Sequence, residues 1–304
     1  MDGAPAGTPT VSVVIPSYNN AAFIEETVQS VLGQTFEDFE LIVADHSSTD
    51  GTWERLQRFL ADPRVRLLQT PTGGGAERNW NAVTAEARGE YVKLVCGDDV
   101  LRPESLERQV TALQNAGPGA VMAASPRDIV DARGAVVMKA RGLAGLRGRI
   151  TGTDAVRATV RSGTNVFGEP ASVLLRRPAL DEAGGWDGRL GYLIDLATYV
   201  RVLERGDLIA VGESLATFRL SSTQWSARLI GDQARQSIEC FRAVRARRPD
   251  ILRRSDLLLG EVRAVALGIA RRLVYLRLGR RLGAAEGASV TSVTPVTDQD
   301  GSQP

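Results

Sequence analysis

The sequence predicts an α/β protein with a doubly wound, mostly parallel sheet flanked by helices, followed by a C-terminal helical extension. Short apolar runs alternate with helical patterns over the first 115 residues, the order that builds a parallel sheet covered on both faces. Polar clusters follow directly after three of these runs, at residues 16–20, 45–52 and 97–99. Beyond residue 225 only two helical patterns remain.

The composition fits one large α/β domain or two small ones. The chain has 304 residues, enough to bury a sizeable core. Its 37 basic and 36 acidic residues nearly balance, so we expect no nucleic-acid partner. The two cysteines, Cys96 and Cys240, make no disulfide framework and fit a reducing compartment. Because no signal peptide and no membrane-spanning apolar run is visible, we expect a cytoplasmic protein.

Four strands are expected in the first half, and helices with apolar residues at helical spacing separate them. The strands cover residues 11–15, 39–44, 65–68 and 91–96. The helices cover residues 21–32, 53–60, 76–87 and 103–116. Asp50 is expected to cap the second helix and Pro103 to open the fourth, while Gly33 and Gly117 end the first and fourth.

The second half is expected to be less regular. A strand at 120–124 precedes a hairpin whose turn is at 131–134 and whose return strand is at 136–138. A polar loop, a strand, a glycine turn, a helix and a further strand follow at residues 164–170, 171–175, 184–186, 195–206 and 208–211.

Two adjacent carboxylates, Asp98 and Asp99, follow the fourth strand. Ligands of open α/β sheets bind beyond the carboxyl ends of the strands, and carboxylate oxygens suit Mg²⁺ or Mn²⁺ shared with a substrate phosphate. The pair could instead form an acidic turn before the next helix, because Asp-Asp is common in turns. The polar clusters after the other strands fall on the same edge, which favours a binding site.

Ordered motifs run from residue 11 onward: VSVVIPSYN at 11–19, QTF at 34–36, FELIVADHSSTDGT at 39–52, RN at 78–79 and GEYVKLVCGDD at 89–99. Later blocks are GEP at 168–170, ASVLLRR at 171–177 and GGWD at 184–187. Together they resemble the inverting nucleotide-sugar glycosyltransferases of family 2, whose fold is called GT-A. The resemblance covers about residues 11–226 and implies a nucleotide-binding half at 10–115 and an acceptor half at 116–225.

The resemblance implies a nucleotide site in the first half. Pro16, Tyr18 and Asn19 would lie beside the base, and Asp45 would hydrogen-bond it. A carboxylate that accepts the imide N–H of uracil would make the pairing selective. Arg78 would reach the diphosphate, although a solvated charge on a helix face is the alternative.

The resemblance also implies that Asp98 holds a Mn²⁺ or Mg²⁺ ion and the ribose, with Asp99 assisting. The family often has a further aspartate where Cys96 stands, and Cys96 is expected to be a small buried residue instead.

Relatives often carry a metal-binding histidine near Ser221, and this chain has none there. Its one histidine, His46, is expected at the surface or stacked on the base. Arg219, Gln224 and Trp225 could close over the diphosphate, or they could have a plain packing role.

Asp195 matches the aspartate taken as the catalytic base in the family. The acidic residue that usually precedes that base is replaced by Ile194, and an apolar neighbour would raise the pKa of the base toward neutral pH. Glu169 is the other candidate base, and Asp195 could also cap its helix.

We therefore expect a metal-dependent inverting glycosyltransferase of the hexosyl- or N-acetylhexosaminyl-transferase class. Its donor is expected to be a UDP-sugar, and its acceptor a hydroxyl or amine of a small molecule, a glycan or a lipid-linked compound. Two alternatives are a catalytically silent sugar-nucleotide-binding or scaffold protein and a nucleotidyltransferase. The second would need a glycine-rich basic loop after the first strand, and residues 16–20 are not one.

Helices are expected over residues 226–285, between the transferase domain and a disordered tail at 286–304; a disordered leader covers 1–9. The second of these helices, at about 257–282, carries an apolar stripe of Leu257, Val265, Ile269 and Leu273 and five arginines near its end. The stripe could pack on the sheet domain or a second subunit, giving a homo-oligomer. It could dock with the arginines at the inner membrane face, or the arginines could form a solvated face. We expect packing, with no vesicle binding.

Overall fold

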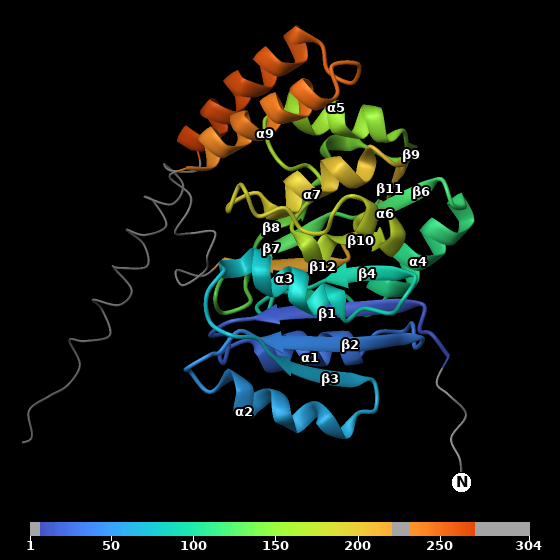
Figure 1. Ribbon diagram of the computed structural model, residues 1–304, viewed down its shortest axis with the longest axis vertical. Helices are drawn as coiled ribbons and strands as arrows, with labels where there is room; N and C mark the ends of the chain where they lie inside the picture. Colours follow the sequence, from blue (N-terminus) through green and yellow to red (C-terminus); the bar gives the residue numbers. More distant parts are fainter. Residues whose placement is uncertain (1–6, 221–231, 271–304) are drawn as a thin grey trace, which may run out of the picture.

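The structure, a computed structural model, describes residues 7–220 and 232–270. Its centre is an eight-stranded sheet in the order β3-β2-β1-β4-β10-β6-β11-β9 (Figure 1). β1 (Val11–Ser17) lies between β2 (Phe39–Asp45) and β4 (Tyr91–Leu94), parallel to both, and β3 (Val65–Gln69) is parallel to β2. The predicted doubly wound, mostly parallel sheet is confirmed.

The other half of the sheet is mixed. β10 (Val173–Arg176) runs antiparallel to both β4 and β6 (Ala120–Ala124), so β4 and β6 point the same way. β11 (Asp207–Ala210) is parallel to β6, and the short β9 (Gly148–Ile150) is antiparallel to β11. Because β10 is reversed, the residues that precede it lie at the edge where β4 ends.

Helices cover both faces of this sheet. Alternate residues of β1 point to opposite sides, with Val13 and Ile15 in one core and Val14 in the other. The Val13 side is covered by α1 (Ile24–Leu32), α2 (Thr52–Leu56) and α4 (Ser105–Ala116). The Val14 side is covered by α3 (Gly75–Ala85), α5 (Gly152–Ser162), α6 (Arg177–Glu182), α7 (Ile194–Leu203) and α9 (Gln233–Arg247).

A second, four-stranded sheet was not expected from the sequence. Its order is β5-β12-β7-β8, with β5 at Val100–Leu101, β12 at Ala216–Arg219, β7 at Arg127–Val130 and β8 at Val136–Arg141. The β7–β8 pair confirms the predicted hairpin, because the Gly134 N–H donates to the Asp131 carbonyl at 3.0 Å.

Two predicted helix starts are wrong. The helix predicted from Pro103 begins at Ser105, because residues 103–104 form a turn that follows β5. Asp50 is not the cap of α2, since Gly51 takes that position with a φ of +89° that glycine adopts readily. Asp50 instead accepts the N–H groups of Thr52 at 3.1 Å and Ala21 at 2.9 Å, which ties two loops together.

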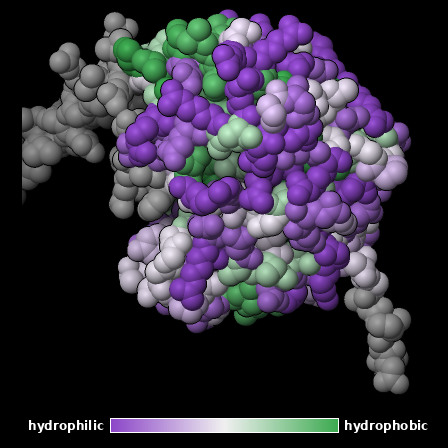
Figure 2. Space-filling view, turned by 45° about the horizontal axis from the view of Figure 1, so that its top comes forward, coloured by the Kyte–Doolittle hydropathy of each residue, from purple (hydrophilic) through white to green (hydrophobic). Residues whose placement is uncertain are grey.

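The C-terminal helices pack at one end of the molecule, next to α5 (Figure 1). Residues 254–270 are helical, and the helix packs through Asp256, Gly260 and Ala264. Of the predicted stripe, Leu257 packs on the core, whereas Val265 and Ile269 are exposed and do not pack on the sheet domain; packing on a second subunit stays a prediction. Hydrophobic side chains gather at the end of the molecule where this helix lies (Figure 2). Within the described residues, no helix is long and apolar enough to cross a bilayer. The predicted tail, Leu273, most of the leader and the boundary at residue 225 lie outside the described residues.

Candidate active site

The polar loops after β1, β2 and β4 meet at one edge of the main sheet. Ser17 and Asp45, the last residues of β1 and β2, are directly paired in the parallel register. β4 ends at Leu94 on the same edge, since Leu94 pairs with Val14 of β1. The sequence prediction that these loops share one edge is confirmed.

Asp45 is held in the loop with one carboxylate oxygen left without a partner. The side chain is buried, and its Oδ2 accepts the Ser48 N–H at 3.1 Å. Its Oδ1 is buried and has no hydrogen-bond partner among the described residues. Asn19 fixes the loop, because its N–H donates to Ser48 Oγ and its Oδ1 accepts the Thr49 N–H, both at 2.9 Å. A buried carboxylate oxygen without a partner is costly, so this atom fits a donor group from a ligand.

Of the residues predicted to contact the nucleotide base, one is exposed and one is buried. Tyr18 is 57% exposed, so it can meet a ligand, whereas Pro16 is buried within β1 opposite Ala44. His46 is buried, so it does not lie at the surface, and its stacking on a nucleotide base stays a prediction; its Nδ1 lies 2.8 Å from Thr70 Oγ1. The His46 and Tyr18 rings meet edge to face at 6.1 Å.

Arg78 lies at the same edge with a free guanidinium. Its neighbour Asn79 is buried, and the Asn79 amide donates to the carbonyls of Ser17 at 3.4 Å and Ala44 at 3.3 Å. Arg78 itself is exposed and makes no hydrogen bond or ion pair within the described part of the chain. Its charge is therefore available to an anionic group bound at this edge.

The acidic pair sits in a tight turn after β4. The Asp99 N–H donates to the Cys96 carbonyl at 3.1 Å and closes the turn. At Gly97 a Cβ atom would lie 2.6 Å from Asn20 Oδ1, so only glycine fits this contact. The turn that carries Asp98 and Asp99 therefore lies against the loop that follows β1.

One carboxylate oxygen of Asp99 has no hydrogen-bond partner among the described residues. Its Oδ1 accepts the Arg219 N–H at 3.2 Å, while its Oδ2 is buried without a hydrogen-bond partner. Burial, then the charges of Asp98 and Glu169, raise the pKa of Asp99 well above its usual range. Residues 7–220 and 232–270 contain no group of three or more acidic, histidine or cysteine side chains that could hold a metal ion. The pair still fits Mg²⁺ or Mn²⁺, which often binds one or two carboxylates plus substrate phosphates.

Glu169 lies just before β10 and is already paired. Arg127 donates to both of its carboxylate oxygens, from Nε to Oε2 and from Nη2 to Oε1, the latter at 2.8 Å. A third donor, Arg127 Nη1, reaches the Arg141 carbonyl at 2.8 Å. This two-point ion pair fixes Glu169 in place and occupies both of its oxygens.

Asp195 is a partly buried carboxylate held by two hydrogen bonds. Its Oδ2 accepts the amide N–H of Asn165 at 2.8 Å, and its Oδ1 accepts the Leu196 N–H at 2.7 Å. Burial is the main cause that raises its pKa to about 7, and the charge of Glu169 adds to the rise. The side chain keeps some contact with solvent. It does not cap its helix, because α7 begins at Ile194 with Leu193 as the cap residue.

Cys96 lies within the electrostatic reach of the whole cluster. Burial, then the charges of Asp99, Asp98, Asp195 and Glu169, raise the pKa of its thiol well above the usual range. The thiol is therefore neutral, and Cys96 is partly rather than fully buried, so the prediction of a small buried residue holds only in part. The four carboxylates, predicted from separate stretches of the chain, are brought together around it.

Sequence reasoning missed Asn165 and Arg127, the side chains that hold Asp195 and Glu169. Asn165 lies in the polar loop that was singled out before β10, so a signal was present, but its partner is 30 residues away. Arg127 lies in the Arg- and Gly-rich stretch after β6 and is separated from Glu169 by 42 residues.

Arg219 packs against the acidic turn, which is one of its two expected roles. Its buried guanidinium donates to the Asp98 carbonyl at 3.1 Å and to Glu26 at 2.7 Å, and lies over the Phe23 ring. Its N–H also binds Asp99. The packing role is therefore the one observed, because these contacts fix the turn that carries Asp98 and Asp99. Gln224 and Trp225 lie outside the described residues.

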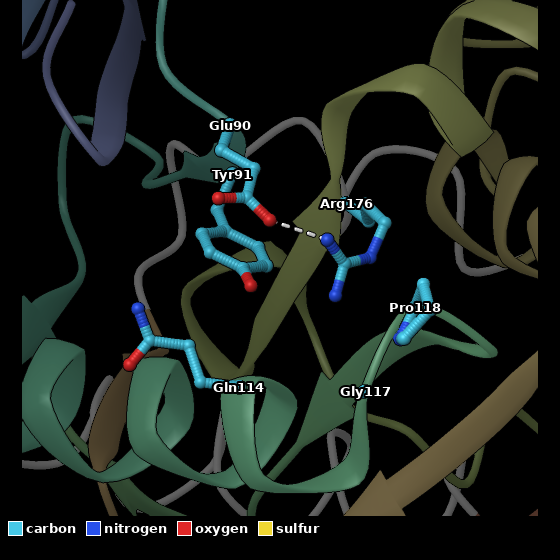
Figure 3. Close-up of a pocket in the computed structure, with 6 residues that line it drawn as sticks. All are labelled: Glu90, Tyr91, Gln114, Gly117, Pro118 and Arg176. Carbon is cyan, nitrogen blue, oxygen red and sulfur yellow. Dashed lines mark hydrogen bonds and ion pairs between the residues drawn. The ribbon is translucent and has the colours of Figure 1, made fainter.

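A hollow of about 310 Å³ lies away from the carboxylate cluster, at the edge where β4 begins and β10 ends (Figure 3). Arg176 and Glu90 are the charged residues among those that line it. The guanidinium already pairs with Glu90 and lies 5.0 Å from the centre of the Tyr91 ring. With its cation occupied and no carboxylate pair nearby, we do not assign the hollow to the active site.

Comparison with known proteins points to one family. The family model described as glycosyl transferase family 2 matches residues 12–182. The chain is 31% identical over 231 residues to an uncharacterized protein of Mycobacterium tuberculosis, a match covering 73% of this chain and 70% of that protein. It is 37% identical over 98 residues to the glycosyltransferase GlyG of Streptococcus pneumoniae, covering 32% of this chain and only 33% of that relative.

Solved structures of glycosyltransferases share the fold. Staphylococcus aureus TarS in complex with UDP-GlcNAc gives a TM-score of 0.62 at 17% identity, over 78% of this chain and 66% of the other. A mannosyltransferase from Pyrobaculum calidifontis in complex with GDP-Man and Mn²⁺ gives 0.59 at 19% identity, over 93% and 83% of the two chains. At these identities the likeness concerns the fold alone, and it confirms the expected GT-A architecture.

Proposed function

Because the chain belongs to glycosyl transferase family 2, we propose that it transfers a sugar from a nucleoside diphosphate to an acceptor hydroxyl or amine, with inversion at the anomeric carbon. The observation that carries the proposal is the meeting of three features at one sheet edge. These are the unpartnered Asp45 oxygen, the Asp98–Asp99 pair and a base, Asp195, whose pKa is raised to about 7.

The donor is proposed to be a UDP-sugar. Asp45 Oδ1 is a buried acceptor without a donor, and the imide N–H of uracil is a donor of matching chemistry. The exposed Tyr18 ring offers an apolar surface beside it. One structural neighbour, TarS, is complexed with UDP-GlcNAc, and another is complexed with GDP-Man. The experiment must therefore distinguish uracil from guanine as the nucleobase.

The diphosphate is proposed to lie between Arg78 and the acidic turn. Arg78 has a free guanidinium at this edge, and guanidinium groups bind phosphate oxygens in fixed geometry. Asp98, with Asp99 behind it, would hold a Mn²⁺ or Mg²⁺ ion that offsets the charge developing on the departing diphosphate. A neighbour of the same fold is complexed with Mn²⁺.

Asp195 is proposed to take the acceptor proton. As the acceptor oxygen or nitrogen bonds to the anomeric carbon, the bond from that carbon to the diphosphate oxygen breaks, and the released proton passes to Asp195 Oδ. Base catalysis is efficient when the pKa lies near the operating pH, and the pKa of Asp195 is raised to about 7. Glu169 suits the role less, because Arg127 occupies both its oxygens.

Acceptor identity is proposed only by class: a hydroxyl or amine of a small molecule, a glycan or a lipid-linked compound. The test is release of nucleoside diphosphate from UDP-GlcNAc, UDP-glucose and GDP-mannose, with and without Mn²⁺, on adding panels of each acceptor class. We expect UDP release that depends on acceptor and metal. Tight binding of a UDP-sugar without release by any acceptor would instead favour a silent binding protein.

A further inference from the structure

Tyr199 carries a buried hydroxyl that no other group of the described chain uses. The residue is fully buried on α7, and its hydroxyl oxygen has no hydrogen-bond partner among the described residues. A hydroxyl that is buried without a partner is destabilising. Such groups are normally satisfied in folded proteins, and a buried water is a common partner.

The helix α7 places this hydroxyl close to Asp195. The two residues are four positions apart in α7, so their side chains lie on the same face. Side chains of a helix lean toward its N-terminus, and Tyr199 therefore leans toward Asp195. Burial, then the charge of Asp195, raise the pKa of Tyr199 well above its usual range, so the hydroxyl keeps its proton near neutral pH. Cys96, Glu169 and Arg127 are the other titratable or charged side chains that face it.

Neighbouring aromatic rings hold the ring of Tyr199 in place. Phe167 and Trp186 meet it edge to face, with ring centres 6.2 Å and 6.4 Å away. Trp186 is itself fixed, because its Nε1 donates to Thr84 Oγ1 at 2.9 Å. The hydroxyl therefore keeps one position relative to Asp195.

Asp195 has room for a further hydrogen-bond donor. An ionised carboxylate offers about four acceptor sites, and the Asn165 amide and the Leu196 N–H take two of them. No direct bond joins Asp195 to the Tyr199 hydroxyl within the described residues. A water that bridges two polar groups is nearly as favourable in enthalpy as a direct hydrogen bond.

We propose that Tyr199 is a positioning residue for the catalytic base: its hydroxyl donates to one buried water, which in turn donates to Asp195 and stabilises the ionised carboxylate. Because Tyr199 is fully buried, it acts through Asp195 and does not touch the substrate. The kinetic consequence rests on the proposed function, in which Asp195 is the base. The hydrogen-bonded link to Asp195 does not rest on it and can be measured without a reaction.

The test compares the melting temperature of Tyr199→Phe with that of the unchanged chain at pH 5 and pH 9. The change removes the hydroxyl and keeps the ring, so the fold should persist. The hydrogen bond stabilises the charged form of Asp195, which predominates above its pKa of about 7. The melting temperature should therefore fall by about 2–4 °C more at pH 9 than at pH 5.

Two controls isolate the link between the hydroxyl and the carboxylate. Tyr91→Phe also removes the hydroxyl of a buried tyrosine, at the first residue of β4, and its effect should be equal at the two pH values. Tyr199→Phe made in the Asp195→Asn background should likewise lose its dependence on pH, because the carboxylate is gone.

The enzyme assay adds a second measurement. In Tyr199→Phe the acidic limb of kcat/KM should move up by about one pH unit, a loss of about fivefold at pH 7 that is recovered at pH 9. If no acceptor releases nucleoside diphosphate from the unchanged chain, the proposed function fails, and the melting comparison still decides this inference.

Two results would overturn the proposal. A melting temperature of Tyr199→Phe that rises at both pH values would show that the hydroxyl is an unsatisfied group in the folded chain. A fall that is equal at pH 5 and pH 9 would show that the hydroxyl only supports the packing of α7.

Discussion

The hydrogen bond from Asn165 to Asp195 allows a strict test of Asp195 as the proposed catalytic base. Asn165→Ala removes the amide that donates to Asp195 Oδ2 at 2.8 Å and leaves the second donor, the Leu196 N–H, in place. The bond stabilises the charged carboxylate, so its loss should raise the pKa of Asp195 above about 7. The protonated carboxyl cannot accept a proton, and activity near neutral pH should fall.

The size of the effect follows from the strength of the bond. A hydrogen bond to a charged group is worth about 1.5–3 kcal/mol, and one pKa unit corresponds to about 1.4 kcal/mol. The pKa of Asp195 should therefore rise by about one to two units. At pH 7 the deprotonated fraction would drop from about one half to between about a tenth and about a hundredth. Raising the pH should restore most of the lost rate.

The assay is the pH profile of kcat/KM for acceptor-dependent release of nucleoside diphosphate. The acidic limb should move to higher pH in Asn165→Ala while the plateau at high pH stays close to that of the unchanged enzyme. Asn81→Ala is the matched control, because the Asn81 amide donates to the Trp186 carbonyl at 2.9 Å and makes no hydrogen bond to Asp195 among the described residues. A rate lowered equally at all pH values, with an unmoved limb, would refute the positioning role of Asn165.

Four further predictions concern the site and its supports. Asp195→Asn should keep donor affinity and lower turnover by roughly 10²–10⁴-fold, and the same pattern in Glu169→Gln alone would exchange their roles. The pKa of Asp195 is raised in the folded chain from 3.8 to about 7. The folded state therefore binds this proton more tightly than the unfolded state, which contributes stability that is fully present below pH 3.8 and is lost as the pH rises through 7. Denaturation of Asp195→Asn should therefore show a gain in the free energy of unfolding at pH 8, at most about 4 kcal/mol, and little gain at pH 3. Asp45→Ala should weaken UDP binding by roughly 10- to 100-fold in calorimetry; unchanged affinity would remove Asp45 from the base site. Gly163→Ala, at a φ of +70° and 2.6 Å from backbone of the C-terminal helix, should destabilise the fold by about 1–3 kcal/mol. Gly145→Ala, at +86° with nothing within 4 Å, should cost less, and equal losses would show that the helix contact is unimportant.

The first half of the site was predictable because its residues follow strands directly. Asp45 ends β2, and Asp98 lies in the turn after β4, so a parallel sheet alone puts them on one edge. The contacts of Asn165 and Arg127 were not predictable in this way. They join residues 30 and 42 positions apart, and they depend on the reversed direction of β10, which the sequence does not reveal.

The C-terminal helix shows a different limit of sequence reasoning. Its apolar residues form two faces, and the pattern alone favoured the one with the larger side chains, including Val265 and Ile269. The structure buries the other face, because Gly260 and Ala264 allow the closest approach to α5. Close approach depends on the shape of the partner surface, which hydrophobic periodicity does not carry.

The central claim is that Asp45, Asp98 and Asp99 form a site for a uracil nucleotide and a divalent cation. Isothermal titration of UDP into the full chain, with and without Mn²⁺, tests it most directly. The account predicts one binding site that Mn²⁺ strengthens, with the Mn²⁺ effect lost in Asp98→Ala while the variant remains folded. Absence of UDP binding, or an undiminished Mn²⁺ effect in Asp98→Ala, would contradict it.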